Sequence, residues 1–199
     1  MLEEAELNED QEKKLERQFS QQYQLITRDD RLETIAADVV EHFLGRGHKG
    51  KAMMICIDKA TAVKMYDKVQ IHWHAKLANL MNQLSKASDE ERGRVLALIE
   101  EMETTDMAVV VSQSQNEIED LKKKGVDISP HRRRMVKENL DEIFKDADSN
   151  LRFVFVCAMW ITGFDVPSCS TIYLDKPMRN HTLMQTIARA NRVAPGKVA

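Results

Sequence analysis

The sequence predicts an α/β fold, with a mostly parallel sheet flanked by helices, and three observations lead to this prediction. Short, continuous apolar runs at 52–57, 107–111 and 153–157 are typical of strands buried on both faces, and a fourth run lies at 171–174. Segments with the i, i+3, i+4, i+7 spacing of amphipathic helices separate these runs. Finally, 43% of the 199 residues are apolar, which is enough for one sizeable core.

Helices are expected between the strands. Residues 29–44 follow the amphipathic pattern closely. The segment from Thr27 to Asp30 can cap this helix, with the acid at its fourth position reaching back, and Gly45 and Gly47 end it. Further helical segments are expected over 59–69, 73–84, 95–102, 132–144 and 181–192.

The chain divides into a short leader and one larger domain. Residues 1–26 are rich in Glu, Gln and Lys and are expected to form a polar helical leader or linker. Residues 27–199 carry all four predicted strands and are expected to form the domain. Within it, residues 112–130 are polar, with Gly125 and Pro130 as breaks.

Charge is distributed unevenly along the chain, although the net charge is only −3. Residues 1–20 hold seven acids and three bases, whereas residues 122–137 hold seven bases and one acid. Residues 151–199 hold six bases and two acids. The global charge therefore says little about nucleic acid, whereas the two basic segments could attract phosphate.

Cysteine usage and hydropathy point to a soluble, cytoplasmic protein. Cys56, Cys157 and Cys169 are scattered in or beside apolar runs, which favours reduced, partly buried thiols over a disulfide framework or a zinc site. No apolar run approaches the length of a membrane span, and the first twenty residues are too charged for a signal peptide.

Two patterns imitate ligand sites. The segment Gly45 to Ala52 matches the phosphate-loop pattern GxxxxGK, but Ala52 lacks the hydroxyl that would hold magnesium. A phosphate loop also follows a strand and opens a helix, and here the predicted order is reversed. His72 and His74 are two residues apart on a helix, so they point in different directions and are best explained as surface residues flanking a core tryptophan.

The run His131-Arg132-Arg133-Arg134 has two interpretations. Charge runs are usually a solvated face. In a domain that binds nucleic acid, the same run favours contacts with backbone phosphate, which carry little sequence specificity.

The last fifth of the chain is the most informative. Thr162-Gly163-Phe164-Asp165 follows a predicted strand, at the carboxyl end where nucleotides bind in α/β sheets, although alone it could simply shape a loop. Gln185, Arg189 and Arg192 have the i, i+4, i+7 spacing that puts all three on one face of a helix. Arginine presents a fixed fork of donors that matches phosphate oxygens, so this face suits a phosphate better than a plain polar stripe does.

These two blocks resemble motifs V and VI of superfamily 2 helicases. The wording FVFVCAMWITGFDVPSCSTIYLDKPMRNHTLMQTIARANRV is similar to the motor (R) subunit of type I restriction endonucleases, and a weaker likeness extends from about residue 27 to residue 197. The resemblance implies the second RecA-like domain of an ATP-driven double-stranded DNA translocase, within an ATP-dependent endonuclease of bacteria or archaea. A different superfamily 2 translocase, or a non-catalytic adaptor with a degenerate nucleotide fold, are the alternatives.

The resemblance also implies roles for individual residues. Gly163 and Asp165 would line the ATP edge, and Gln185 would face the nucleotide. Arg189 and Arg192 would reach the γ-phosphate, one of them as the arginine finger. DNA-backbone contacts are expected from Cys157, Thr162, Arg132, Arg133 and Arg134.

Several parts of such a motor are not recognisable in this sequence. It contains no acceptable Walker A loop, no DEAD- or DEAH-type magnesium box and no nuclease cluster. The family places all of these N-terminal to the region considered, in a first RecA-like domain and a nuclease domain, so ATP would be shared with that domain, which would also hold Mg²⁺. The chain is therefore expected to be a fragment, inactive alone, whose full-length subunit works with specificity and methylation subunits.

Overall fold

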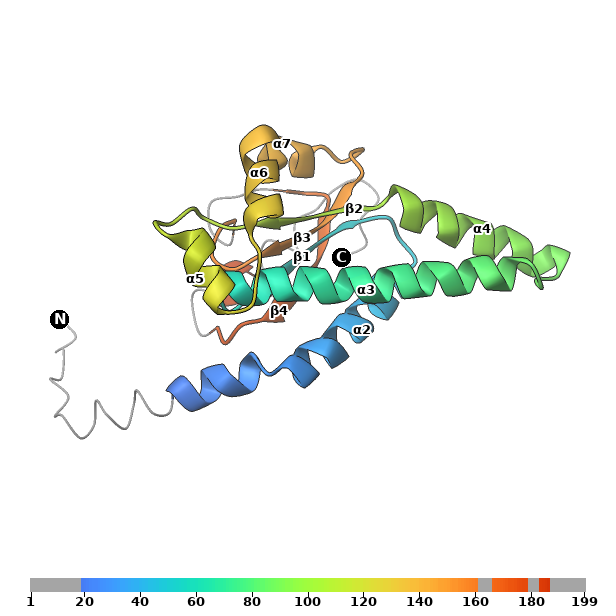
Figure 1. The fold of residues 1–199 in the computed structure, drawn as a ribbon. Coiled ribbons are helices and arrows are strands. Elements are labelled where there is room, and N and C mark those ends of the chain that lie inside the picture. Colours follow the sequence, from blue (N-terminus) through green and yellow to red (C-terminus); the bar gives the residue numbers. More distant parts are fainter. Residues whose placement is uncertain (1–18, 161–165, 179–182, 187–199) are drawn as a thin grey trace, which may run out of the picture.

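The protein is built on a single parallel sheet. The computed structural model describes residues 19–160, 166–178 and 183–186. Its four strands are β1 (Lys51–Cys56), β2 (Asp106–Val110), β3 (Leu151–Val156) and β4 (Cys169–Asp175). They lie in the order β2-β3-β1-β4, and every neighbouring pair is parallel (Figure 1). The prediction that the four apolar runs share one sheet is confirmed, with each strand shifted by no more than two residues.

Helices cover both faces of this sheet (Figure 1). The described helices are α2 (Asp29–Gly45), α3 (Lys59–Leu84), α4 (Asp89–Thr104), α5 (Glu117–Lys123), α6 (Ser129–Lys137) and α7 (Leu140–Lys145). The larger core cluster joins apolar residues of α2, α3 and α4 to one face of the strands. The smaller cluster joins α7 to the other face. The predicted α/β fold class is therefore confirmed.

Aromatic side chains fill the centre of the larger cluster. Phe43 of α2 stacks on Phe153 with ring centroids 5.2 Å apart, and Phe153 stacks on Phe155 at 4.6 Å. Trp73 of α3 meets the edge of Phe43 at 5.7 Å, and its indole N–H donates to the carbonyl of Met102 at 3.2 Å. Stacked and edge-to-face pairs stabilise a core beyond their buried area. This cluster fixes α2, α3 and α4 against the sheet.

Three predicted helical segments differ from the helices observed. The segments 59–69 and 73–84 are one continuous helix, α3, because no glycine or proline interrupts residues 70–72. The segment 132–144 is two helices, since Glu138 leaves α6 with an extended backbone (φ −114°, ψ 140°). That break lets Leu140 and Phe144 turn into the smaller cluster, whereas α6 buries none of its own residues.

Three further predictions, on a helix cap, the polar stretch 112–130 and the terminal helices, compare with the structure as follows. The proposed cap from Thr27 to Asp30 is wrong: the N-cap is Arg28 without a side-chain cap bond, and Asp30 pairs with Arg28 instead. The helix α5 was not predicted from the polar stretch 112–130. The helical leader is observed over residues 19–26, and the predicted last helix is described only at 183–186, which are helical.

The three cysteines are free and buried, as expected from the sequence. In the described ranges, no helix is both long and apolar enough to cross a membrane.

Candidate nucleotide and DNA edge

The candidate site lies along the carboxyl edge of the sheet, because all four strands point the same way. Past their ends lie Asp58 and Lys59 after β1, Ser112 after β2, Cys157 after β3 and Lys176 after β4. In open α/β sheets, ligands bind in the crevice outside this edge. The sequence-predicted TGFD segment also follows β3, and its residues 162–165 lie outside the described ranges.

A buried carboxylate organises the β2 side of the edge. Glu117, with a side chain only 5% exposed, accepts from Arg132 through both carboxylate oxygens at 2.9 Å. Lys59 also donates to it, at 3.2 Å. Arg132 reaches further, to the carbonyls of Val111 and Ser112. The network ties α3, α5 and α6 to the end of β2, and its bidentate geometry makes it the strongest kind of ion pair.

The three arginines predicted to contact DNA therefore fall into two groups. Arg132 is held by Glu117, and Arg134 pairs with Asp106 and with Glu138. Arg133 is exposed and makes no side-chain hydrogen bond or ion pair within the described ranges. Sequence reasoning could not separate these three neighbours, because their partners come from segments that are distant in the chain.

Cys157 lies at the edge but turns inward. Its residue is 7% exposed, and burial raises the pKa of its thiol, although Lys176 and Lys59 oppose this shift. Its carbonyl accepts from Lys176 Nζ at 3.2 Å. The thiol therefore offers little surface to a ligand, and the DNA contact proposed for Cys157 stays a prediction.

The β1–β4 side of the edge is closed by the helical stretch 19–26. The Tyr23 hydroxyl donates to Asp58 at 2.6 Å, and Lys124 Nζ lies 3.2 Å from the same carboxylate. Burial raises the pKa of Asp58, but hydrogen bonds from Tyr23 and Thr61 outweigh it, so the pKa is below its usual range. Nearby, Arg31 pairs with the buried Asp175 at the end of β4. No sequence signal marked Tyr23 or Asp58 as partners.

Most predicted nucleotide-contacting residues lie outside the described ranges. These are Gly163, Asp165, Arg189 and Arg192, together with the proposed DNA contact Thr162. Gln185 is described, and it is exposed within the helical residues 183–186. Its proposed role remains a prediction.

The structure explains the GxxxxGK segment and the two histidines, which resemble ligand sites in the sequence. Gly45 ends α2 and Lys51 begins β1, so the GxxxxGK segment follows a helix and precedes a strand, as predicted. Lys51 is 1% exposed, and its ammonium donates to the carbonyl of Asp146 and to Ser149 Oγ. His72 contacts Glu33 and His74 contacts the carbonyl of Gln70, on either side of buried Trp73.

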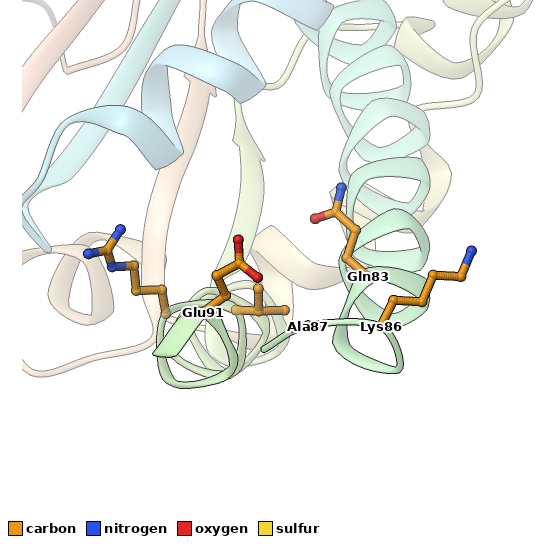
Figure 2. A pocket seen from close by; sticks show the side chains of 6 residues that line it. Gln83, Lys86, Ala87 and Glu91 are labelled. Carbon is orange, nitrogen blue, oxygen red and sulfur yellow. The ribbon is translucent and has the colours of Figure 1, made fainter. Parts of the chain in front are cut away.

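A shallow cavity of about 370 Å³ opens at the turn between α3 and α4. Figure 2 shows the lining residues Gln83 in the last turn of α3, Lys86 just after that helix and Glu91 in the first turn of α4. Glu91 is already bound to the backbone and hydroxyl of Ser88 as part of a capping box. The turn that carries this cavity is the end of the α3–α4 hairpin that extends beyond the sheet, away from the carboxyl edge (Figure 1).

The all-parallel sheet with helices on both faces is that of a RecA-like α/β domain. Comparison with known proteins identifies the family within this class. Residues 48–198 match the family described as type I restriction enzyme subunit R domain 3, so the chain belongs to that family. The resemblance predicted from the sequence is thereby confirmed.

Individual relatives agree with the family assignment. The chain is 34% identical over 182 residues to a putative type I restriction enzyme MjaIXP endonuclease subunit of Methanocaldococcus jannaschii, which covers 90% of this chain. It is 33% identical over 178 residues, 87% of the chain, to the type I restriction enzyme HindI endonuclease subunit of Haemophilus influenzae. The chain spans only 14% of the length of each relative.

Proposed function

We propose that this domain is the second RecA-like half of an ATP-driven motor that moves double-stranded DNA through a type I restriction enzyme. The observation that carries the proposal is the family match, together with a parallel sheet whose strands β3 and β4 precede the TGFD segment and the Gln185–Arg192 segment along the chain. Nucleotides bind at the carboxyl edge of α/β sheets. The relatives are named as endonuclease subunits of type I restriction enzymes, which supports a role within a restriction complex. The partners in that complex would be specificity and methylation subunits.

ATP would bind between this domain and a first RecA-like domain. Gly163, Asp165 and Gln185 would line this wall of the site, whereas Mg²⁺ would be held by the other domain, so the domain alone would be inactive. The arginines Arg189 and Arg192 would approach the γ-phosphate. A guanidinium there would stabilise the charge that develops during phosphoryl transfer.

DNA would contact cations of this domain through its phosphates. Lys176 follows β4 and donates to the Cys157 carbonyl at the end of β3, and Arg133 and Lys137 are exposed on α6, whereas Lys59 is held by the buried Glu117. Arg132 and Arg134 act differently in this proposal, since both are engaged in ion pairs within the domain. They would position α6 rather than bind phosphate.

The test uses the full-length subunit that carries this chain. Replacing Arg189 or Arg192 by Ala should lower DNA-stimulated ATP hydrolysis by about 10³–10⁵-fold for whichever is the finger, as for arginine fingers elsewhere. Lysine should not rescue, because a point charge lacks the planar fork. Arg92→Ala, at an exposed position of α4, is the matched control and should hydrolyse ATP normally. Wild-type turnover by both finger variants would refute the proposal.

A further inference from the structure

Two exposed apolar side chains lie between α5 and α6, beside unpaired cations. A cavity of about 470 Å³ opens there, and its lining residues are Ile118, Ser129, Arg132, Arg133, Val136 and Lys137. The five lining residues that α6 contributes have the spacing of a single helix face. Val136 is 76% exposed and Ile118 is 44% exposed. Exposed apolar surface beside polar groups is typical of an interaction site, and this surface is named the α5–α6 groove.

Among the described residues, two cations of the groove are free to pair with a ligand. Arg133 and Lys137 are exposed, and neither makes a side-chain hydrogen bond or an ion pair there. They are one turn apart on α6 and flank Val136, so an acid that pairs with them lies beside an apolar contact. Four neighbouring basic side chains are already held by ion pairs within the domain: Lys123 with Asp120, Lys124 with Asp58, Arg132 with Glu117, and Arg134 with Asp106.

A neighbouring cavity limits where the acids of a ligand can lie. It has a volume of about 280 Å³, and Ile118 and Arg132 line both cavities. Its other lining residues include Asn116 and Glu119, and the exposed Glu119 has no ion pair in the part of the chain that the structure describes. A second carboxylate beside Glu119 would be repelled. The groove therefore favours a ligand whose acids lie on the α6 side of Ile118.

This pattern fits a protein segment better than DNA. A nucleic acid carries a phosphate at every nucleotide, so its charges would extend toward Glu119 and leave Val136 in contact with water. A peptide can place apolar side chains and acids independently. Ser129 and Lys137 lie about 12 Å apart along the axis of α6, at about 1.5 Å per residue. An extended chain spans roughly 3.3 Å per residue, so about four residues fill the groove.

We propose that the α5–α6 groove binds a short, extended segment of a partner protein. Apolar side chains of this segment contact Val136 and Ile118, and neighbouring carboxylates pair with Arg133 and Lys137. The interaction is independent of the proposed motor function. If that function also holds, the segment and DNA phosphates compete for the same two cations, so each lowers the affinity of the other.

The test measures the binding of a labelled probe to the intact chain. The probe is a fluorescein-labelled octapeptide that repeats Leu-Leu-Asp-Asp, and fluorescence anisotropy follows its titration with the protein. Val136→Ser should weaken binding by at least about fivefold, because it removes apolar area from the contact. Arg133→Gln and Lys137→Gln should each weaken it by about two- to fivefold, as for exposed ion pairs. Glu119→Gln should strengthen it, since a like charge is removed.

Two exposed positions outside the groove serve as matched controls, and Ile71→Ser on α3 and Arg92→Gln on α4 should leave the affinity unchanged. Circular dichroism verifies that every variant is folded. The inference is wrong if the probe fails to bind, if Val136→Ser binds it as tightly as the parent chain, or if lysine in place of aspartate preserves binding. A random-sequence DNA duplex whose affinity also falls with Val136→Ser would overturn it, because the groove would then hold nucleic acid.

Discussion

The buried carboxylate of Glu117 offers the sharpest test of the site geometry. Glu117→Ala would leave the guanidinium of Arg132 and the ammonium of Lys59 without their shared partner. Removing one partner of a buried ion pair costs about 3–5 kcal/mol. Arg132 and Lys59 are 16% and 23% exposed, so water can partly solvate them after the change, which lowers the expected loss. We therefore expect about 2–3 kcal/mol.

Urea and thermal denaturation measure this loss. For a domain of this size, 1 kcal/mol corresponds to roughly 2–4 °C, so the melting temperature should fall by roughly 4–12 °C. Glu119→Ala, on the same helix but exposed, is the matched control and should change stability by less than about 0.5 kcal/mol. A double-mutant cycle with Arg132→Ala should show strong coupling. If Glu117→Ala and Glu119→Ala were equally stable, the network would not organise the edge.

Three further predictions follow from described contacts. Burial lowers the pKa of Lys51 to about 8, below its unfolded value of 10.5, so stability should rise between about pH 8 and 10.5 as the folded state loses its proton first; Lys51→Met should flatten that rise in pH-dependent denaturation. Gly50→Ala should destabilise by about 1–3 kcal/mol, because a Cβ there would lie 2.1 Å from Ser170 Oγ and 2.9 Å from Ser170 Cβ. Adding Ser170→Gly should restore the melting temperature, and a failure to restore it would contradict this explanation. Arg134→Ala should lower thermal stability whereas Arg133→Ala should not, and the reverse order would contradict the division of the arginines made above.

The sequence predicted the sheet well because its signal is local. Strands β1, β2 and β3 are mostly apolar runs buried on both faces, and such a run can be recognised without knowledge of its neighbours. Helix boundaries were less predictable where tertiary packing decides them. The break at Glu138 lets Leu140 and Phe144 face a different core cluster from the one that α2 and α3 fill. No glycine or proline in residues 132–144 marks the position of this break in the sequence.

Candidate site residues were predicted by type but not by partnership. The run from Arg132 to Arg134 was recognised as basic, yet its division depends on Glu117 and Asp106, which lie at least fifteen residues away in the chain. Glu117 itself resembles any exposed acid of a polar stretch. Its burial follows from the meeting of α3, α5 and α6 at the end of β2, which local periodicity cannot show.

The long helix α3 has a mechanical consequence. Its 26 residues make a rod of about 39 Å, and Figure 1 shows that α3 and α4 extend together beyond the sheet. The first half of α3 is fixed to the sheet, and the Trp73–Met102 hydrogen bond ties α4 to it. A point about 30 Å from the pivot moves about 0.5 Å for every degree of rotation. A rigid rotation of this domain that leaves its own core unchanged would therefore be magnified at the far end of the hairpin, as at the end of a lever arm.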